Sequence, residues 1–175
     1  LAEIAEARRQ GVPALAEVEL AWRFLGSTPL VAITGTNGKS TTTALAGALF
    51  RQDRRAFVGG NLGTPLCEHV LSGRAVDVVV AELSSFQLEG IERLRPRVAA
   101  LLNLTPDHLD RYRDMREYAS AKARIFMNQQ AGDFAVANAR DPLALGLAGS
   151  SRGELYTFDF GTPVARSMRN ADPTP

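Results

Sequence analysis

The sequence predicts an α/β domain in which a mostly parallel sheet is flanked by helices. Two observations carry this prediction. Short apolar runs rich in β-branched residues recur along the chain, and stretches with helical character separate them. Strands that alternate with helices form parallel sheets covered on both faces. The 175 residues, of which 45% are hydrophobic, suffice for one well-cored domain.

Five apolar runs are the predicted strands of this sheet. The run "VDVVVAEL" is unbroken by polar alternation, as is typical of a central parallel strand. The five runs span residues 29–34, 55–60, 76–83, 97–104 and 133–139. Two of the intervening stretches are predicted helices, at residues 40–50 and 115–129. Residues 161–175 contain three prolines and little apolar pattern, which predicts an irregular tail.

The composition excludes several classes of function. Twenty basic and 19 acidic residues leave a net charge of +1, so no nucleic-acid surface is expected. No apolar run approaches the roughly 20 residues that a membrane span requires. The single Cys67 fits a reducing cytoplasm, and we expect a cytoplasmic monomer. Because the chain begins without methionine, we expect it to be a fragment of a longer protein.

The stretch "ITGTNGKST" (residues 33–41) has the context of a phosphate-binding loop. The common pattern G-x-x-x-x-G-K-[ST] would place glycine at Ile33, so this loop, G-T-N-G-K-S, is two residues shorter. It follows a predicted strand and begins a predicted helix, whose N–H groups and dipole favour an anion. Lys39 can add charge between phosphates, and Ser40 or Thr41 can ligate Mg²⁺. The alternative is a glycine turn with a surface lysine.

An acidic residue ends the third predicted strand. Glu82 lies where ligands bind in open α/β sheets, beside the carboxyl ends of the strands. A carboxylate there can hold a metal ion next to phosphates, although a solvated glutamate is the commoner outcome for this pattern alone. Ser84 and Ser85 can cap the following helix or contact a substrate, and the sequence leaves both roles open.

Two further polar residues occur near these elements. His108, between Asp107 and Asp110, follows the next strand, where it could ligate a metal ion or contact phosphate. His69 lies in a helix-like context and is expected to be structural or exposed. Lys122 has small neighbours in its predicted helix, and composition alone favours a solvated helix lysine.

Five motifs together resemble the Mur ligase family. In the order and approximate spacing of that family they read "GTNGKST", "GGNLGTPL", "ELSSFQLE", "NLTPDHLDRY" and "YASAKARIF". "ELSSFQLE" together with "GVPALAEVELAW" is most similar to the D-glutamate-adding members. The resemblance implies a three-domain enzyme. Residues 1–28 would end its uridine-nucleotide domain, residues 29–160 would form the central P-loop-type ATPase domain, and the fragment would be inactive alone.

The resemblance also implies a reaction. It is the ATP-dependent addition of D-glutamate to UDP-N-acetylmuramoyl-L-alanine, an amide-forming step of peptidoglycan synthesis and so of cell-wall biogenesis. The substrate carboxylate would attack the γ-phosphate to give an acyl phosphate and ADP, and the amine would then displace phosphate. Two alternatives stay open. One is another Mur or folylpolyglutamate-type ligase, and the other is a nucleotide-binding module without ligase chemistry.

The resemblance assigns roles at the nucleotide and metal sites. The residues around the ATP phosphates would be Gly35, Thr36, Asn37, Gly38, Lys39, Ser40 and Thr41. Ser40 would ligate Mg²⁺, and Glu82 and His108 would ligate a second Mg²⁺. Lys122 matches the lysine that the family carries as a CO₂-derived carbamate, an anionic group beside the metal.

The resemblance assigns the remaining contacts to substrate and adenine. Asn61 and Ser84 would contact the muramoyl substrate or its phosphates. Asn138 would lie near the adenine ring. The family often has an acidic residue where Arg140 stands, so the resemblance is weaker at that contact.

Overall fold

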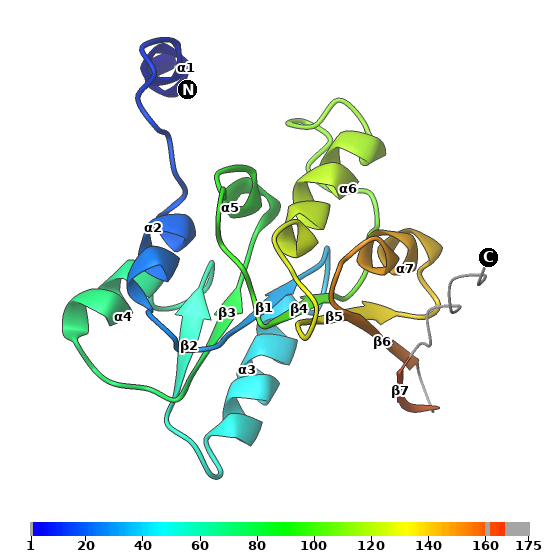
Figure 1. Ribbon diagram of the computed structural model, residues 1–175. Helices are drawn as coiled ribbons and strands as arrows, with labels where there is room; N and C mark the ends of the chain where they lie inside the picture. Colours follow the sequence, from blue (N-terminus) through cyan, green and yellow to red (C-terminus); the bar gives the residue numbers. More distant parts are fainter. Residues whose placement is uncertain (1, 160–161, 167–175) are drawn as a thin grey trace, which may run out of the picture.

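A computed structural model describes residues 2–159 and 162–166 of the chain (Figure 1). Within them one sheet has the strand order β2-β3-β1-β4-β5-β6-β7, with every neighbouring pair parallel except β6 and β7. The strands are β1 (Leu30–Thr34), β2 (Ala56–Gly60), β3 (Val78–Glu82), β4 (Val98–Leu101), β5 (Phe134–Asn138), β6 (Glu154–Asp159) and β7 (Thr162–Arg166). The predicted fold class is confirmed.

Helices cover both faces of this sheet (Figure 1). They are α1 (Ala2–Arg9), α2 (Glu17–Phe24), α3 (Lys39–Phe50), α4 (Leu66–Ser72), α5 (Ser85–Glu89), α6 (Met115–Ala123), continued by the 3₁₀ turn Arg124–Phe126, and α7 (Pro142–Gly149). Successive strand side chains point to opposite faces, which divides the core into two clusters. Val31 and Ile33 pack toward α3, whereas Leu30 and Ala32 join the larger cluster under the other helices.

The C-terminal part departs from the sequence prediction. Residues 154–159 had no regular pattern, yet they form β6 beside β5. The predicted irregular tail is wrong for residues 162–166, which pair with β6 as the antiparallel strand β7. The rest of that predicted tail, residue 161 and residues 167–175, lies outside the described residues. Hydrogen bonding to the open edge of a sheet outweighs a weak local pattern here.

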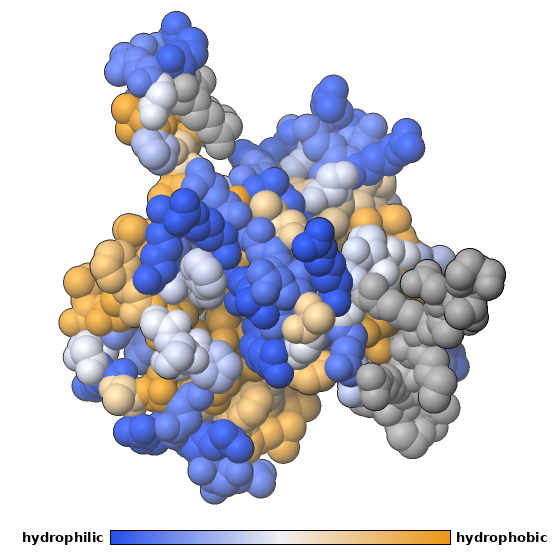
Figure 2. All heavy atoms as spheres, in the orientation of Figure 1, coloured by the Kyte–Doolittle hydropathy of each residue, from blue (hydrophilic) through white to orange (hydrophobic). Residues whose placement is uncertain are grey.

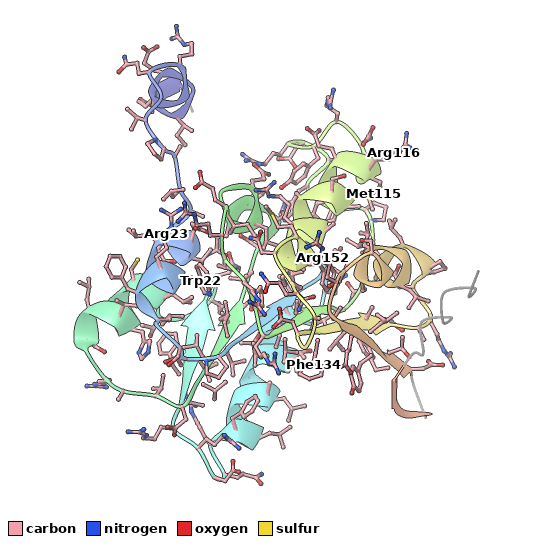
Figure 3. All side chains as sticks on the ribbon, in the orientation of Figure 1. Trp22, Arg23, Met115, Arg116, Phe134 and Arg152 are labelled. Carbon is pink, nitrogen blue, oxygen red and sulfur yellow. The ribbon has the colours of Figure 1, made fainter. Side chains whose placement is uncertain are left out.

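Helix α2 is bound firmly to the sheet domain. Val18 and Ala21 are buried in the main core, and Trp22 packs against it; Figure 3 labels Trp22 and Arg23 on this helix. The fully buried carboxylate of Glu19 accepts hydrogen bonds from Arg23 Nε and from the backbone N–H groups of Glu92, Arg93 and Leu94. Burial alone would raise the pKa of Glu19, but these donors together hold the pKa below its usual value.

Apolar side chains also reach the surface in places. Figure 2 shows hydrophobic residues gathered over α4 and over the lower part of the molecule. The exposed residues include Phe24, Leu45, Leu49 and Leu71. None of the helices in the described part of the chain is long and apolar enough to span a bilayer.

Candidate functional site

The predicted site residues follow neighbouring strands at one edge of the sheet. In the register of β1 and β3, Ile33 pairs with Glu82. In the register of β1 and β4, Thr34 pairs with Leu101. Because these strands are parallel, the loop after β1, the end of β3 and the segment after β4 meet at their carboxyl ends. This is the edge where open α/β sheets bind ligands.

The loop after β1 presents the start of α3 to this edge. Gly38 is the N-cap of α3 and has φ 79°, a left-handed conformation that favours glycine. No side chain caps the helix within the described residues, and its first turn carries no acidic residue. The first N–H groups of a helix have no intrahelical partner, and the helix dipole adds positive potential there. The geometry therefore suits a phosphate group.

Lys39 begins α3 and folds back over the loop. Its half-buried side chain donates from Nζ to the backbone oxygen of Thr36, 2.8 Å away. Ser40 and Thr41 follow in the first turn, and both are exposed. The ammonium group and two hydroxyl groups thus lie at the same helix end as the uncapped N–H groups.

Segment 103–105 after β4 holds the loop from one side. The side chain of Asn103 accepts from the N–H of Asn37 at 2.8 Å and donates to the oxygen of Asn37 at 3.0 Å. Thr36 donates its N–H to Asn103 O, and its hydroxyl accepts the N–H of Thr105 at 3.1 Å. Asn103 was not among the residues predicted from this segment. Its place at the end of a predicted strand was the signal available in the sequence, and the strand order then brings it to the loop.

Glu82 is buried at the end of β3 with one oxygen unpaired. Its side chain is 2% exposed, and Oε1 accepts from Asn61 Nδ2 at 2.9 Å. Its Oε2 has no hydrogen-bond partner among the described residues. Gly60 makes the close approach possible, because a Cβ there would lie 2.3 Å from the Glu82 backbone oxygen. An unpaired buried carboxylate oxygen is costly unless a cation or a donor meets it.

Lys122 lies inside the domain. Its side chain, on α6, is 2% exposed, so the solvated-lysine alternative is wrong. Nζ donates to the backbone oxygen of Gly35 at 2.9 Å and to Thr34 Oγ1 at 3.4 Å. Burial, and then the charge of Lys39, lower the pKa of Lys122 to about 8, against the opposing effect of Asp107 and Glu82. Its small neighbours Ala119 and Ala121 are buried in the main core, where α6 packs against α5 and α7.

His108 follows β4 in a left-handed backbone conformation with φ 53°. Its side chain is 44% exposed, and Nε2 lies 3.5 Å from Asp107 Oδ2. Its ring centroid is 5.0 Å from that of Phe86 and 6.2 Å from that of Tyr118. His108 therefore lies at the rim of the edge, in contact with aromatic side chains. The other histidine, His69, is buried in α4 and stacks on Phe57.

The remaining predicted residues lie at the same edge but bond locally. Ser84 is the N-cap of α5 and forms a capping box with Gln87, so its capping role is confirmed. Asn61 is exposed apart from its bond to Glu82. Asn138 ends β5, two strands from β1, and its Oδ1 accepts the N–H of Arg140. Arg140 pairs with Asp159, which leaves it turned toward β6.

Among the described residues, the predicted Mg²⁺ ligands do not form a cluster of acidic and histidine side chains. Within residues 2–159 and 162–166, no three His, Cys, Asp or Glu side chains converge on one point. A site for Mg²⁺ would therefore draw on Ser40 and the phosphates of a bound nucleotide as well. The unpaired buried Oε2 of Glu82 is an oxygen of the kind that Mg²⁺ prefers. The residues present thus fit a metal ion that arrives with a nucleotide.

A parallel sheet with an uncapped, glycine-started helix after its central strand defines a nucleotide-phosphate-binding α/β domain. Comparison with known families makes the class specific. Residues 33–172 match the Mur ligase middle domain. The chain belongs to the Mur ligase family.

Close relatives share one description. A UDP-N-acetylmuramoylalanine–D-glutamate ligase from Anaeromyxobacter dehalogenans is 68% identical over 96% of this chain and 36% of its own length. The protein of the same description from Myxococcus xanthus is 59% identical over 94% of this chain and 37% of its own length. The chain thus spans about a third of the length of these relatives.

Solved structures show the same fold at lower identity. MurF ligase from Thermotoga maritima, determined in complex with ADP, matches with a TM-score of 0.67 and 23% identity, over 83% of this chain and 36% of its own. FolC from E. coli, with DHPP and ADP, matches with a TM-score of 0.57 and 17% identity, over 82% of this chain and 46% of its own. At these identities the likeness establishes the fold.

Proposed function

We propose that this chain is the ATP-binding domain of an enzyme that joins D-glutamate to UDP-N-acetylmuramoyl-L-alanine. The observation that carries the proposal is the 68% identity to a ligase of that description over 96% of the chain. The reaction consumes ATP: the L-alanyl carboxylate attacks the γ-phosphorus and releases ADP, and the D-glutamate amine attacks the acyl phosphate and releases phosphate. A cytoplasmic monomer is part of the proposal, consistent with the single Cys67.

The loop from Gly35 to Thr41 would bind the ATP phosphates. The uncapped N–H groups at the start of α3 supply donors, and Lys39 supplies a mobile positive charge. Phosphoryl transfer requires positioning and charge neutralisation more than covalent help from the protein. Asn138, at the end of β5, would lie toward the adenine, although its side chain now bonds Arg140 N.

Mg²⁺ would be held at this edge by four side chains, those of Ser40, Glu82, His108 and Lys122. Bound Mg²⁺ would neutralise charge on the phosphate oxygens. Glu82 supports this role because its buried Oε2 has no hydrogen-bond partner in the part of the chain that the structure describes. His108 is the weaker candidate, since its ring is half exposed and contacts Phe86 and Tyr118.

Lys122 would act as a carbamate formed with CO₂. Carbamate formation requires the neutral amine, and the lowered pKa of about 8 makes that form accessible near neutral pH. The modification replaces a buried cation by an anion with oxygen atoms suited to Mg²⁺. It would also remove the repulsion between Lys122 and Lys39 at this edge.

Asn61 and Ser84 would contact the muramoyl substrate. The amide of Asn61 is exposed and is oriented by its bond to Glu82 Oε1. The hydroxyl of Ser84 takes part in the capping box of α5 and is half-buried, so a substrate contact would share that oxygen. Ser84 follows β3, the neighbour of β1, and Asn61 follows β2, the next strand beyond β3.

Phosphate release by the full-length protein tests the proposal. The assay contains ATP, Mg²⁺ and UDP-N-acetylmuramoyl-L-alanine, with D-glutamate, L-glutamate, L-lysine or meso-diaminopimelate added in turn. Release that depends on D-glutamate is the expected result. Stimulation by a different amino acid would assign the chain to another ligase of the family. Nucleotide binding without release under any condition would leave a binding module.

A further inference from the structure

The backbone N–H and C=O of Asn37, in the middle of the phosphate loop, both bond to one side chain. Asn103 Oδ1 accepts the Asn37 N–H at 2.8 Å, and Asn103 Nδ2 donates to the Asn37 oxygen at 3.0 Å. A carboxamide can bond to both backbone groups of one residue because its own acceptor oxygen and donor nitrogen lie side by side. Asn37 is exposed and Asn103 half-buried, so the pair is not part of the hydrophobic core.

The surrounding contacts hold Asn103 close to the loop. Thr36 donates its N–H to the backbone oxygen of Asn103 at 3.0 Å. Gly35 lies so near that a Cβ there would be 3.1 Å from the Cβ of Leu102 and 3.3 Å from the nitrogen of Asn103. The loop after β1 and the segment after β4 therefore form one unit at the carboxyl edge.

A loop binds phosphate when its backbone N–H groups converge on the phosphate oxygens. A loop with glycines at positions 35 and 38 has many accessible backbone conformations, and ordering it on binding would reduce affinity. The bond to Asn103 also occupies the Asn37 N–H. The donors left at this helix end, among the described residues, are those from Gly38 to Thr41.

We propose that Asn103 is a positioning residue that clamps the backbone N–H and C=O of Asn37 and so holds the phosphate loop in its nucleotide-binding conformation. This inference rests on the proposed function, since it assumes that the loop binds nucleotide phosphates. Asn103 acts through the loop and is not assigned a contact with the reacting atoms. Because residues 103–105 continue to Asp107 and His108, the clamp also joins the nucleotide loop to the rim of the site.

Asn128 offers a matched control. Its side-chain Nδ2 donates to the backbone oxygens of Glu92 and Leu94, both at 3.0 Å, away from the carboxyl edge. Asn128→Leu therefore removes hydrogen bonds between a carboxamide and the backbone, as Asn103→Leu does, without touching the phosphate loop. A general loss of stability would appear in both variants, whereas a loss of loop positioning would appear only in Asn103→Leu.

The experiment compares the full-length wild-type protein with these two variants. Titration calorimetry measures the affinity for the non-hydrolysable ATP analogue AMP-PNP with Mg²⁺, and hydrogen exchange measures protection of the Asn37 amide without nucleotide. Loss of two ordinary hydrogen bonds predicts that Asn103→Leu weakens AMP-PNP binding about tenfold. It should also expose the Asn37 amide, while Asn128→Leu leaves both quantities unchanged.

Asn103→Asp provides a second variant if Asn103→Leu does not fold. Its carboxylate still accepts the Asn37 N–H but no longer donates to the Asn37 oxygen, so the amide should stay protected while AMP-PNP binds more weakly. Wild-type affinity in a folded Asn103 variant, or equal weakening in Asn128→Leu, overturns the clamp. If wild-type protein does not bind AMP-PNP, the proposed function fails. The Asn37 exchange data then still report whether the clamp exists.

Discussion

Replacing Lys122 by methionine should stabilise the folded chain while it inactivates the enzyme. The side chain is 2% exposed, and its pKa is lowered from the usual 10.5 to about 8, first by burial and then by the charge of Lys39. Folding at neutral pH therefore takes an ammonium group out of water at a cost. Methionine fills a similar volume with an unbranched chain and no charge.

The size of the effect follows from that difference in pKa. A fall from 10.5 to about 8 corresponds to about 3 kcal/mol of lost stability at pH 7. Lys122→Met also loses the hydrogen bond from Nζ to the Gly35 oxygen, and this loss reduces the gain in stability by about 1 kcal/mol. The expected net gain is about 2 kcal/mol, or about 6 °C in melting temperature for a chain of this length.

The gain should depend on pH in a defined direction. Below pH 8 the lysine is charged in both the folded and the unfolded chain, so the full cost applies. Between pH 8 and 10.5 the unfolded chain binds more protons than the folded chain, and the stability of the wild type rises with pH. The advantage of Lys122→Met should therefore be greatest below pH 8 and should vanish at about pH 10, where the electrostatic cost equals the contribution of the lost hydrogen bond. Above that pH the wild type should be the more stable protein.

Urea unfolding at pH 7, 8, 9 and 10 measures this difference directly. The buffers must be depleted of CO₂, so that the amine of the wild type stays unmodified. Ligation assays of the full-length protein should show severe loss of activity for Lys122→Met and for Lys122→Arg, because neither can form a carbamate. If Lys122→Met is less stable than the wild type at pH 7, the electrostatic reasoning is refuted. Full activity of Lys122→Arg would refute the carbamate.

Three further predictions concern other parts of the site and fold. Lys39→Ala should lower ATP turnover of the full-length protein at least about 100-fold with an unchanged circular dichroism spectrum, because charge on the transferred phosphate loses its partner; near-normal turnover would contradict the loop assignment. Gly60→Ala should cost about 3 kcal/mol in urea unfolding, against about 1 kcal/mol for Gly63→Ala. Both glycines have positive φ, but only at Gly60 would a Cβ meet the backbone, 2.3 Å from the Glu82 oxygen. Equal losses would contradict this steric explanation. Glu19→Ala should cost about 3 kcal/mol at pH 7, because several hydrogen-bond donors lose a fully buried acceptor. Glu117→Ala, at a side chain that is 41% exposed, should cost much less. Since the pKa of Glu19 is lowered on folding, this contribution is present above pH 4.5 and is lost as pH falls through the folded pKa, so a difference that persists in acid would contradict it.

Local patterns in the sequence were enough to predict most of the sheet. Each of the first five strands lies within an apolar run, and α3 begins one residue before its predicted start. The glycine turn that begins α3 was also predictable, because its glycines, lysine and hydroxyl groups are contiguous, and its phosphate-binding role stays a prediction. Strands β6 and β7 were not predicted. Strand β6 pairs with the open edge of β5, and β7 in turn pairs with β6, so both depend on contacts that local sequence does not show.

Contacts between distant segments were decided by the tertiary structure. In the sequence, Lys122 resembles any helix lysine, and it is buried because α6 packs over the loop after β1. Asn103 and Asn37 are 66 residues apart, and they meet because the strand order places β4 beside β1. The sequence by itself determined the first five strands and the starts of α3 and α6, since those depend on near neighbours. The tertiary structure decided the rest. Which strands lie side by side determines the burial of Lys122, its lowered pKa and the bonds from Asn103 to the loop.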